Sequence, residues 1–304
     1  MLQIDPNNIP LTEIFEPCIQ AKNSRLFILR EDLIHPQISG NKWRKLKYNI
    51  AETKRQKKNT ILTFGGAYSN HIAATAAAGK HFGLKTIGVI RGEENLPLNP
   101  TLQLAKGNGM VFKYVSREAY RNKNETTFIA ALKAAFGEFY LVPEGGSNVF
   151  AVKGCTEIIE NIAIDFDVIC VACGTGGTLA GIIASTEKEV LGFPALKGGS
   201  FLIEDVQQLL LSYNPKLNKE NWNLNTDYHF GGYAKVKPNL IAFVQQFKQK
   251  HNIPLDLIYT GKMLFGIYDL LQNTNQLDNK VIVAVHTGGV QGNKGFEERL
   301  GIKL

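Results

Sequence analysis

Apolar residues along this chain follow two alternating patterns. Short apolar runs, typical of buried strands, are separated by stretches in which apolar residues recur every three or four positions, as on one face of a helix. The runs predict strands at 26–30, 60–64, 85–90, 110–115, 140–142, 167–172 and 281–285. The helical spacing predicts helices at 72–82, 101–108, 125–136, 151–162 and 178–185, and one from about residue 42 to the basic run 54–58. This alternation predicts an α/β fold with parallel sheets covered by helices.

The stretch 184–239 follows neither pattern. It is rich in Gly, Asn, Lys and Tyr and has weak periodicity, so we expect mixed loops and short helices there. Small-residue loops follow four predicted strands, at 65–70, 143–148, 173–178 and 286–289. Because ligands bind at the carboxyl ends of parallel strands, these loops are the first candidates for a functional site.

The composition sets broad limits on function. The 304 residues are 44% hydrophobic and 20% charged, which suits two globular domains or one large one. The net charge of +7 requires nucleic-acid binding to be considered. The densest basic run, Lys54–Lys58, ends a predicted helix, and we interpret it as solvated. A basic, non-catalytic nucleic-acid-binding protein is kept as an alternative, although no module with interleaved aromatic and basic residues is recognisable.

The cysteines and the chain start indicate a reducing, cytoplasmic setting. Four cysteines are too few for a disulfide framework in a chain of this length. The first residues lack the basic and apolar regions of a signal peptide, and no apolar run is long enough to span a membrane. Cys170 and Cys173 form a C-x-x-C motif inside a predicted strand. Because a zinc ribbon needs a second such pair, we predict inert, buried thiols and no metal site.

The loop Gly174-Thr175-Gly176-Gly177-Thr178 links a predicted strand to a predicted helix. Its backbone N–H groups can bind a phosphate at the helix N-terminus. It fits neither a dinucleotide fingerprint nor a P-loop, because Leu179 and Ile182 stand where those motifs need glycine and lysine. The loop predicts a site for a compact phosphate without a motif lysine, and a structural tight turn is the alternative.

Two further segments carry candidate chemistry. Lys42 follows the turn signal Ser39-Gly40-Asn41 and begins a helix whose apolar face is Trp43, Leu46 and Ile50. The positive end of that helix favours a neutral amine, the nucleophile that forms a Schiff base; a solvated lysine in a basic cluster is the alternative. In the second segment, Gly65 to His71, the Ser69, Asn70 and His71 side chains suit a carboxylate, and a simple helix N-cap is the alternative. Together, an amine and a phosphate nest suggest pyridoxal phosphate (PLP).

Six segments, in order, resemble the 1-aminocyclopropane-1-carboxylate (ACC) deaminase and D-cysteine desulfhydrase family of tryptophan-synthase-β-like, fold-type II PLP enzymes. The resemblance implies two parallel-sheet domains of three αβα layers. The segments are Arg30-Glu31-Asp32, Gly40-Asn41-Lys42-x-Arg44-Lys45-Leu46, Gly65-Gly66-x-x-Ser69-Asn70-His71, Gly174-Thr175-Gly176-Gly177-Thr178, Tyr259-Thr260-Gly261-Lys262 and His286-Thr287-Gly288-Gly289.

The resemblance also implies residue roles. Lys42 is similar to the Schiff-base lysine and Gly174, Thr175, Gly176, Gly177 and Thr178 to the phosphate cup. Ser69, Asn70 and His71 resemble the loop that binds the substrate carboxylate, with Ser69 placed for proton transfer and Asn70 near the ring hydroxyl. Tyr259 and Tyr233 resemble two active-site tyrosines, and Thr287 resembles the hydroxyl that meets the pyridine nitrogen. A neutral hydroxyl there gives a weaker electron sink, which suits elimination better than transamination.

The resemblance implies elimination from a small amino acid, most like D-cysteine to pyruvate, sulfide and ammonia. ACC conversion to 2-oxobutanoate and ammonia is the alternative. Ring-opening members tend to carry an acidic residue where this chain has Thr260 and glutamine where it has His71. After Tyr233, the chain has Ala234-Lys235-Val236 instead of the family's usual Gly-Leu/Val-Pro.

The resemblance also implies a domain division and an assembly. We expect a larger PLP-binding domain from residues 1–45 and 154–304, and a smaller domain, 46–153, that closes on the substrate. We also expect a homodimer, because two-fold assemblies are common.

Overall fold

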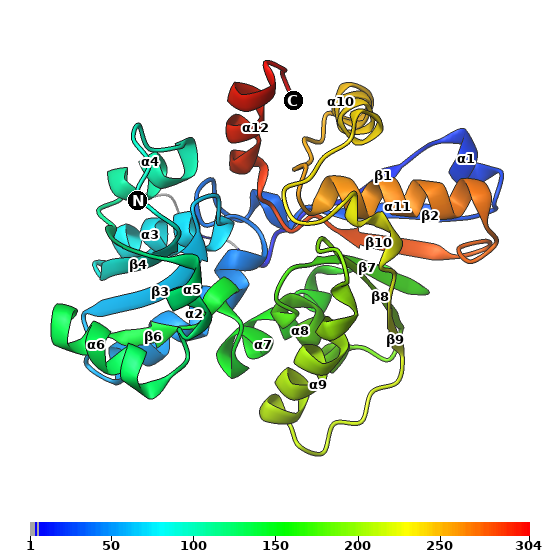
Figure 1. Ribbon diagram of the computed structural model, residues 1–304. Coiled ribbons are helices and arrows are strands. Elements are labelled where there is room, and N and C mark those ends of the chain that lie inside the picture. The colour runs from blue at the N-terminus through cyan, green and yellow to red at the C-terminus, as the bar shows by residue number, and fades with distance from the viewer. Residues whose placement is uncertain (1–3, 5) are drawn as a thin grey trace.

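The strands of the computed structural model, which describes residues 4 and 6–304, form two separate sheets (Figure 1). The expected absence of a signal peptide concerns the chain start, where residues 1–3 and 5 lie outside the described part. One sheet has the order β1-β2-β10-β7-β8-β9 and the other β5-β4-β3-β6. Neighbouring strands pair in parallel, apart from the antiparallel pair β1–β2. The strands are β1 Leu11–Ile14, β2 Arg25–Leu29, β3 Thr60–Gly66, β4 Lys85–Arg91, β5 Val111–Val115, β6 Tyr140–Val142, β7 Val168–Cys173, β8 Glu189–Pro194, β9 Trp222–Leu224 and β10 Val281–Val285.

Helices cover both faces of each sheet, so each half of the molecule has three layers. The helices are α1 Pro17–Gln20, α2 Asn41–Arg55, α3 Asn70–Phe82, α4 Pro100–Gly107, α5 Arg117–Arg121, α6 Thr126–Phe136, α7 Val149–Thr156, α8 Gly177–Ser185, α9 Leu202–Tyr213, α10 Pro238–His251, α11 Thr260–Asn273 and α12 Asn293–Leu300. The 3₁₀ turns are η1 Glu31–Leu33, η2 Glu144–Gly146, η3 Ile159–Asn161, η4 Gly199–Phe201, η5 Asp227–His229 and η6 Val290–Gly292.

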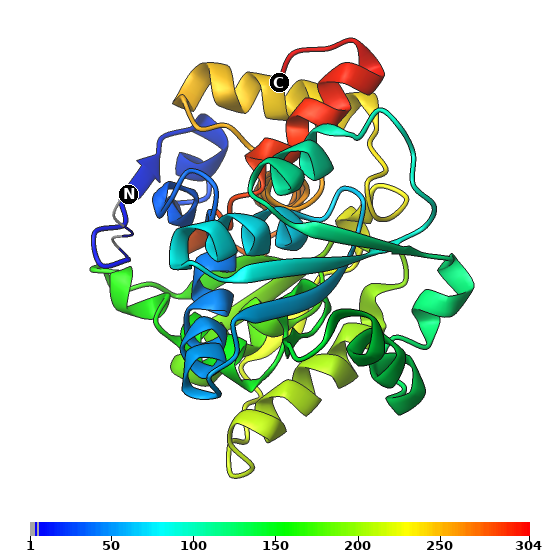
Figure 2. The same cartoon turned by 90° about the vertical axis from the view of Figure 1, so that its left-hand side faces the viewer.

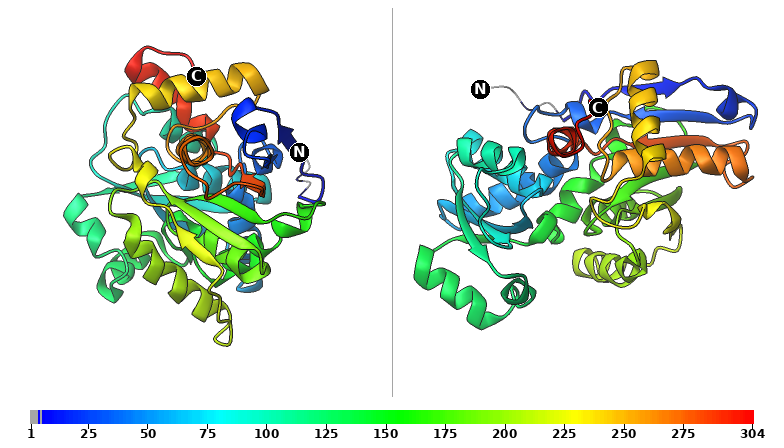
Figure 3. Two further views of the ribbon diagram at one scale, coloured as in Figure 1. Left: turned by 90° about the vertical axis from the view of Figure 1, so that its right-hand side faces the viewer. Right: turned by 45° about the horizontal axis from the view of Figure 1, so that its top comes forward.

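Separate apolar cores hold the layers together. In the four-stranded lobe, α3 and α4 pack on one face of the sheet, and α5 and α6 pack on the other (Figure 2). In the six-stranded lobe, the core that includes α8 and α9 lies on one face, and the core that includes α10 and α11 lies on the other. The two lobes lie side by side in Figure 3 (right). The sequence-based prediction of a three-layer α/β fold with two parallel sheets is confirmed.

Helix α2 lies between the lobes and carries the predicted apolar face. Trp43, Leu46 and Ile50 are buried in the core that also takes residues from α3, α7 and α8. Gly40, which precedes the helix, has φ +61, and a Cβ there would overlap the carbonyl of Thr287. Only glycine tolerates both conditions, so the turn before α2 packs directly on the loop after β10.

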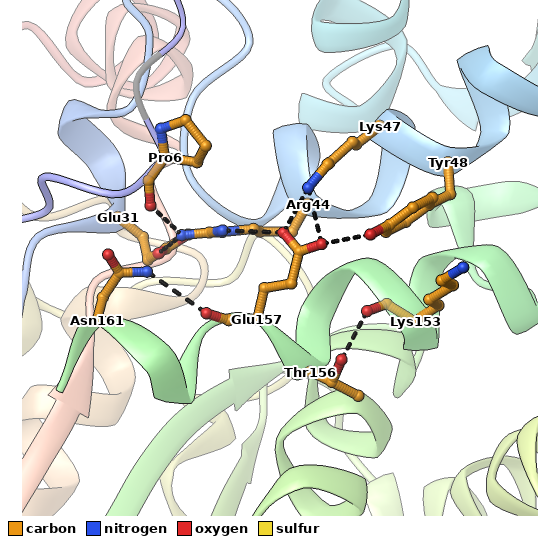
Figure 4. A network of polar contacts seen from close by, with 9 residues as sticks. All are labelled: Pro6, Glu31, Arg44, Lys47, Tyr48, Lys153, Thr156, Glu157 and Asn161. Atoms are coloured by element: carbon orange, nitrogen blue, oxygen red, sulfur yellow. Dashed lines mark hydrogen bonds and ion pairs between the residues drawn. The ribbon is translucent and has the colours of Figure 1, made fainter.

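A buried ion-pair network fixes α2 on its other side (Figure 4). Arg44 is 1% exposed and pairs with the fully buried Glu31, with an Nη2–Oε1 distance of 2.8 Å. Arg44 Nη1 also lies 3.3 Å from the Glu157 carboxylate at the end of α7. Glu157 accepts further hydrogen bonds from Lys47 at 2.7 Å and from the Tyr48 hydroxyl at 2.6 Å. Helices α2 and α7 are therefore joined by charge as well as by apolar packing.

Two sequence-based predictions of local structure need correction. The stretch 184–239 is not only mixed loops and short helices, because it also contains the strands β8 and β9 and the 12-residue helix α9. Gly192 sits inside β8 because the side chains of Leu224 and Leu179 occupy the space that its Cβ would need. The helix expected at 151–162 runs from Val149 to Thr156 and is followed by the 3₁₀ turn η3.

Other expectations hold in the structure. Cys170 and Cys173 are buried in β7, and burial raises the pKa of both thiols, to about 12 for Cys173. The predicted burial of both thiols is confirmed. The basic run 54–58 begins in the last turn of α2 and is largely exposed. Within residues 4 and 6–304, we find no helix with the length and apolar character needed to span a bilayer.

Candidate active site

A cavity of about 320 Å³ lies where loops of both lobes meet. Eleven of the twelve predicted site residues line it: Lys42, Ser69, Asn70, His71, Gly174, Thr175, Gly176, Thr178, Tyr233, Tyr259 and Thr287. Gly177 does not line the cavity but packs behind it, where a Cβ would lie 2.7 Å from Ser147 Oγ. Residues scattered from 42 to 287 in the sequence thus meet at one place.

Lys42 is in the first turn of α2, as predicted. Burial lowers the pKa of its amine to about 7, and the nearby charge of Lys45 acts in the same direction. Burial therefore favours the neutral amine, which is the form that attacks an aldehyde. The main cause of the low pKa of Lys42 is desolvation, whereas the sequence suggested the positive end of the helix.

Lys45, one turn further along α2, is a site residue that sequence reasoning missed. Its ammonium donates to Ser147 Oγ at 3.0 Å, to Gly145 O at 3.1 Å and to Thr175 Oγ1 at 3.4 Å. The residue is 2% exposed, and burial lowers its pKa. No carboxylate among the described residues lies within ion-pair distance of this amine. Because a buried charge without a counter-ion is costly, a phosphate is a suitable partner for this amine. Helix α2 thus supplies the lysine that the motif of the glycine loop lacks.

The Gly174–Thr178 loop turns from β7 into α8 as predicted. Gly176 adopts φ +74 immediately before α8, and the first backbone N–H groups of that helix have no partner within it. Asn41 Nδ2 donates a 2.8 Å hydrogen bond to Thr178 Oγ1. Because Asn41 precedes Lys42, this bond joins the lysine helix to the phosphate loop. Asn41 also lines the cavity.

Ser69 has the structural role that the sequence left as an alternative, since its Oγ caps α3 by accepting from Ile72 N at 3.3 Å. It also lines the cavity. A capping oxygen accepts that bond and keeps its own proton available for a ligand. The two interpretations of the Gly65–His71 loop are therefore compatible.

His71 is neutral and its tautomer follows from its neighbours. The Thr63 hydroxyl donates to Val142 O at 2.8 Å, so it accepts from His71 Nε2, also at 2.8 Å. Nδ1 is then an unprotonated, buried acceptor without a partner. Burial lowers the pKa of the ring well below its ordinary value, with Lys42 and Lys45 adding to the shift. A lone pair does not bind a carboxylate, so the loop's backbone N–H groups are better suited to that role than the His71 side chain.

Asn70 is positioned by a residue that sequence analysis did not single out. Gln291 Nε2, in η6 of the other lobe, donates to Asn70 Oδ1 at 3.1 Å. With its oxygen engaged, Asn70 directs Nδ2 as its remaining donor group. A Cβ at Gly289 would lie 2.8 Å from that Nδ2, so the amide packs closely on the 287–292 loop. Gln291 lines the cavity as well.

Tyr259 and Tyr233 form a pair at the cavity wall. Their ring centroids are 6.2 Å apart in an edge-to-face arrangement. Burial and the hydrogen bond and charge of Tyr233 raise the pKa of Tyr259 well above its ordinary value. Asp256 fixes Tyr259 by accepting from its backbone N at 2.9 Å, and Thr260 Oγ1 donates to the same carboxylate at 2.7 Å. Both tyrosines are thus protonated donors, and Thr260 faces Asp256 rather than the cavity.

The loop after β10 presents Thr287. His286 lies behind it, with Nε2 donating to Pro254 O at 2.6 Å and Nδ1 accepting from Gly288 N at 3.2 Å. Thr287 is 7% exposed and lines the cavity with Gly288 and Gly289. The loop therefore supplies a fixed neutral hydroxyl.

These residues fit PLP. The partly neutral Lys42 amine suits its aldehyde, and the Gly174–Thr178 loop with the unpaired Lys45 charge suits its phosphate dianion. Asn70 Nδ2 and the Thr287 hydroxyl are polar groups suited to the ring hydroxyl and ring nitrogen. The donors and charges of the cavity match the two polar ends and the ring of this cofactor.

Comparisons with known proteins agree with this fit. Residues 8–288 match the family described as pyridoxal-phosphate dependent enzyme. A putative ACC deaminase of Pyrococcus furiosus is 29% identical over 297 residues, covering 90% of this chain and 88% of the relative. The mitochondrial bifunctional D-cysteine desulfhydrase/ACC deaminase of Arabidopsis thaliana is 29% identical over 293 residues, covering 88% and 73%. The crystal structure of an ACC deaminase homologue superposes with a TM-score of 0.86 at 26% identity, covering 98% of this chain and 94% of that one.

Proposed function

The chain belongs to the pyridoxal-phosphate dependent enzymes, and we propose that it catalyses αβ-elimination from D-cysteine, giving pyruvate, sulfide and ammonia. Its relatives support a PLP-dependent lyase or deaminase acting on a small amino acid, and this replaces the alternative of a non-catalytic nucleic-acid-binding protein. The reaction consumes one water, since D-cysteine plus water balances pyruvate, hydrogen sulfide and ammonia.

Bound PLP supplies an electron sink for the bond that breaks at Cα. Backbone N–H groups of the Ser69 loop, at the start of α3, bind and orient the substrate carboxylate. The Lys42 amine, once the substrate has taken its place, moves the proton at Cα, a task suited to its pKa of about 7. Ser69 Oγ is a second group placed for proton transfer.

The tyrosine pair supports an elimination as the proposed reaction. Burial raises the pKa of the Tyr259 hydroxyl, so it is a proton donor and not a base. It can donate its proton to a departing sulfur, with Tyr233 beside it as the next hydroxyl. The neutral Thr287 hydroxyl leaves the cofactor ring a weak sink, which favours early departure of a leaving group.

Thr260 is the single observation that favours D-cysteine over ACC. Ring-opening members tend to carry an acidic residue at this position. Here the side chain is a threonine whose hydroxyl is fully used by Asp256. Position 260 therefore supplies no carboxylate, although Glu144 and Asp205 line the cavity elsewhere. ACC deamination is kept as the second candidate because the Pyrococcus and Arabidopsis relatives are named for it.

A substrate panel on the purified protein tests the proposal. The protein with PLP should absorb at ~410–420 nm, the range of a lysine-bound cofactor, and Lys42→Ala should lose this band. D-cysteine should give equal amounts of sulfide and pyruvate, while L-cysteine and ACC should give much less. Turnover of ACC alone would select the second candidate, and a colourless protein in excess PLP would reject both.

The domain division and the homodimer are proposals too. The four-stranded sheet lies within 60–142, which supports a closing domain at 46–153 and a cofactor domain at 1–45 and 154–304. The homodimer is supported by the general frequency of two-fold assemblies, and sedimentation velocity would test it.

A further inference from the structure

Lys262 is a buried cation that the proposed reaction does not use. It lies in the first turn of α11, is 2% exposed, and has no carboxylate within ion-pair distance among residues 4 and 6–304. Its Nζ donates to three backbone carbonyls: Gly232 O at 2.8 Å, His229 O at 2.9 Å and Ala195 O at 3.4 Å. Burying an ammonium is costly unless its hydrogen bonds are made. The burial of Lys262 therefore suggests a specific structural role.

Each segment that this ammonium contacts continues into the cavity wall. Gly232 precedes Tyr233, Ala195 precedes Leu196, and Lys262 lies one turn after Tyr259 on its own helix. Leu196, Tyr233 and Tyr259 all line the cavity. One buried charge therefore joins three separate wall segments directly behind the residues that face the ligand.

The segment around Tyr233 needs such a support. Phe230 and Ala234 have φ +54 and +55, and Gly231 and Gly232 have φ +97 and +120. Left-handed conformations are unfavourable for residues other than glycine, and they persist only where surrounding contacts impose them. Ala234 carries a Cβ, so at φ +55 it bears strain that a glycine would not. Two turn hydrogen bonds, Gly232 N to His229 O and Lys235 N to Gly232 O, complete the segment.

We infer that Lys262 is a positioning residue of this site: its ammonium acts as an internal cation that fixes the 229–235 segment and holds Tyr233 against Tyr259. The catalytic part of this inference rests on the proposed function, because Tyr233 matters only if it contacts the substrate. The structural part does not, since the order of the segment can be measured without any substrate.

Hydrogen exchange of the PLP-bound protein tests the structural part. In Lys262→Met, peptides covering 229–235 should exchange about tenfold faster or more, the effect of losing one charged hydrogen-bonding group. Peptides from the phosphate loop and α2 should be unchanged, as should the cofactor absorption band. Lys235→Met, at an exposed lysine of the same segment, is the matched control and should leave exchange unchanged. Unaltered exchange in Lys262→Met would overturn the inference.

Chemical rescue tests the catalytic part. Lys262→Ala leaves the three carbonyls around an empty volume, and methylammonium chloride should restore at least half of the lost turnover with saturable dependence. Tetramethylammonium, which has the same charge but no N–H group, should not.

If Lys262→Ala is poorly folded, Lys262→Gln keeps one donor group and should show intermediate exchange and turnover. Equal rescue by both salts, or none, would contradict a role for the ammonium as donor, whereas an inactive wild-type protein with the expected exchange pattern would reject only the proposed function.

Discussion

Asn41 and Thr178, 137 residues apart in the sequence, are joined by a 2.8 Å hydrogen bond from amide to hydroxyl. One residue precedes the reactive lysine and the other ends the phosphate loop. The bond therefore links the position of the amine to that of the phosphate loop, and we expect the affinity for PLP to depend on it.

Asn41→Ala should weaken PLP binding about fivefold to tenfold, because a typical neutral hydrogen bond contributes about 1 kcal/mol. Titration of the cofactor-free protein, followed by absorbance, measures the change. Asn95→Ala is a control at an exposed asparagine outside the cavity. Equal PLP affinities for Asn41→Ala and wild type would show that the bond does not align Lys42 with the phosphate loop.

Lys45→Met should weaken binding of PLP by about tenfold to a hundredfold, the range for a charge-assisted hydrogen bond to phosphate. Binding of pyridoxal, which lacks the phosphate, should change little. The ratio of the two affinities is the measurement, and Lys54→Met, at an exposed lysine of the same helix, is the control. A parallel loss for both ligands would assign Lys45 a purely structural role.

The low pKa of Lys42 predicts how stability depends on pH. Burial lowers this pKa from 10.5 to about 7 in the folded protein. Between these values the unfolded chain binds a proton that the folded chain has released, so the free energy of unfolding rises with pH. Urea denaturation of the cofactor-free protein at pH 7, 8 and 9 should show this rise, with a smaller slope in Lys42→Met. Lys45 and Lys262 contribute in the same direction in both proteins, so parallel curves would refute the low pKa of Lys42 itself.

Gln291→Leu should raise KM for the amino acid about fivefold, since it removes one neutral hydrogen bond that orients Asn70. The melting temperature should change little, because Gln291 is only half-buried. Steady-state kinetics measure the effect, and Gln245→Leu on the exposed face of α10 is the control. A fall in PLP affinity as large as the change in KM would indicate that Gln291 acts through the cofactor site as a whole.

Arg44→Met should destabilise the protein by about 3–5 kcal/mol, because it leaves Glu31 buried without its partner. Urea denaturation gives the value. Arg55→Met, which removes the exposed partner of Glu52 on the same helix, should cost less than about 1 kcal/mol. Similar losses for the two variants would show that the network in Figure 4 adds no more than a surface pair.

Local patterns in the sequence predicted much of the fold because they depend on local physics. The apolar runs of β3, β4 and β7 and the Trp43–Leu46–Ile50 face of α2 are properties of single segments. β8 was missed because Gly192 and Pro194 are read as strand breakers, and the requirement for glycine there comes from Leu224, 32 residues away (224 − 192). Helix α9 does have an apolar stripe, at Leu202, Val206 and Leu210, hidden by the irregular sequence around it.

In the candidate site too, the sequence predicted the residues of local motifs but not those defined by long-range contacts. Lys42 and the Gly174–Thr178 loop could be selected by sequence because a motif carries them. Lys45 was not singled out, although its position one turn after Lys42 on the same helix face could have placed it near the phosphate. Gln291 and Lys262 act through contacts with Asn70 and with three distant carbonyls, and no spacing in the sequence reports such contacts.

The placement of Lys42 and Lys45 on one turn of α2 has a consequence for how such an enzyme can change its substrate. The helix fixes the distance between the Lys42 amine, which suits the aldehyde of the cofactor, and the Lys45 ammonium, which suits its phosphate. The residues that we propose to contact or select the amino acid, Ser69, Tyr233, Tyr259 and Thr260, lie on other segments. Evolution can therefore change the substrate preference of this fold without altering the helix that positions the cofactor.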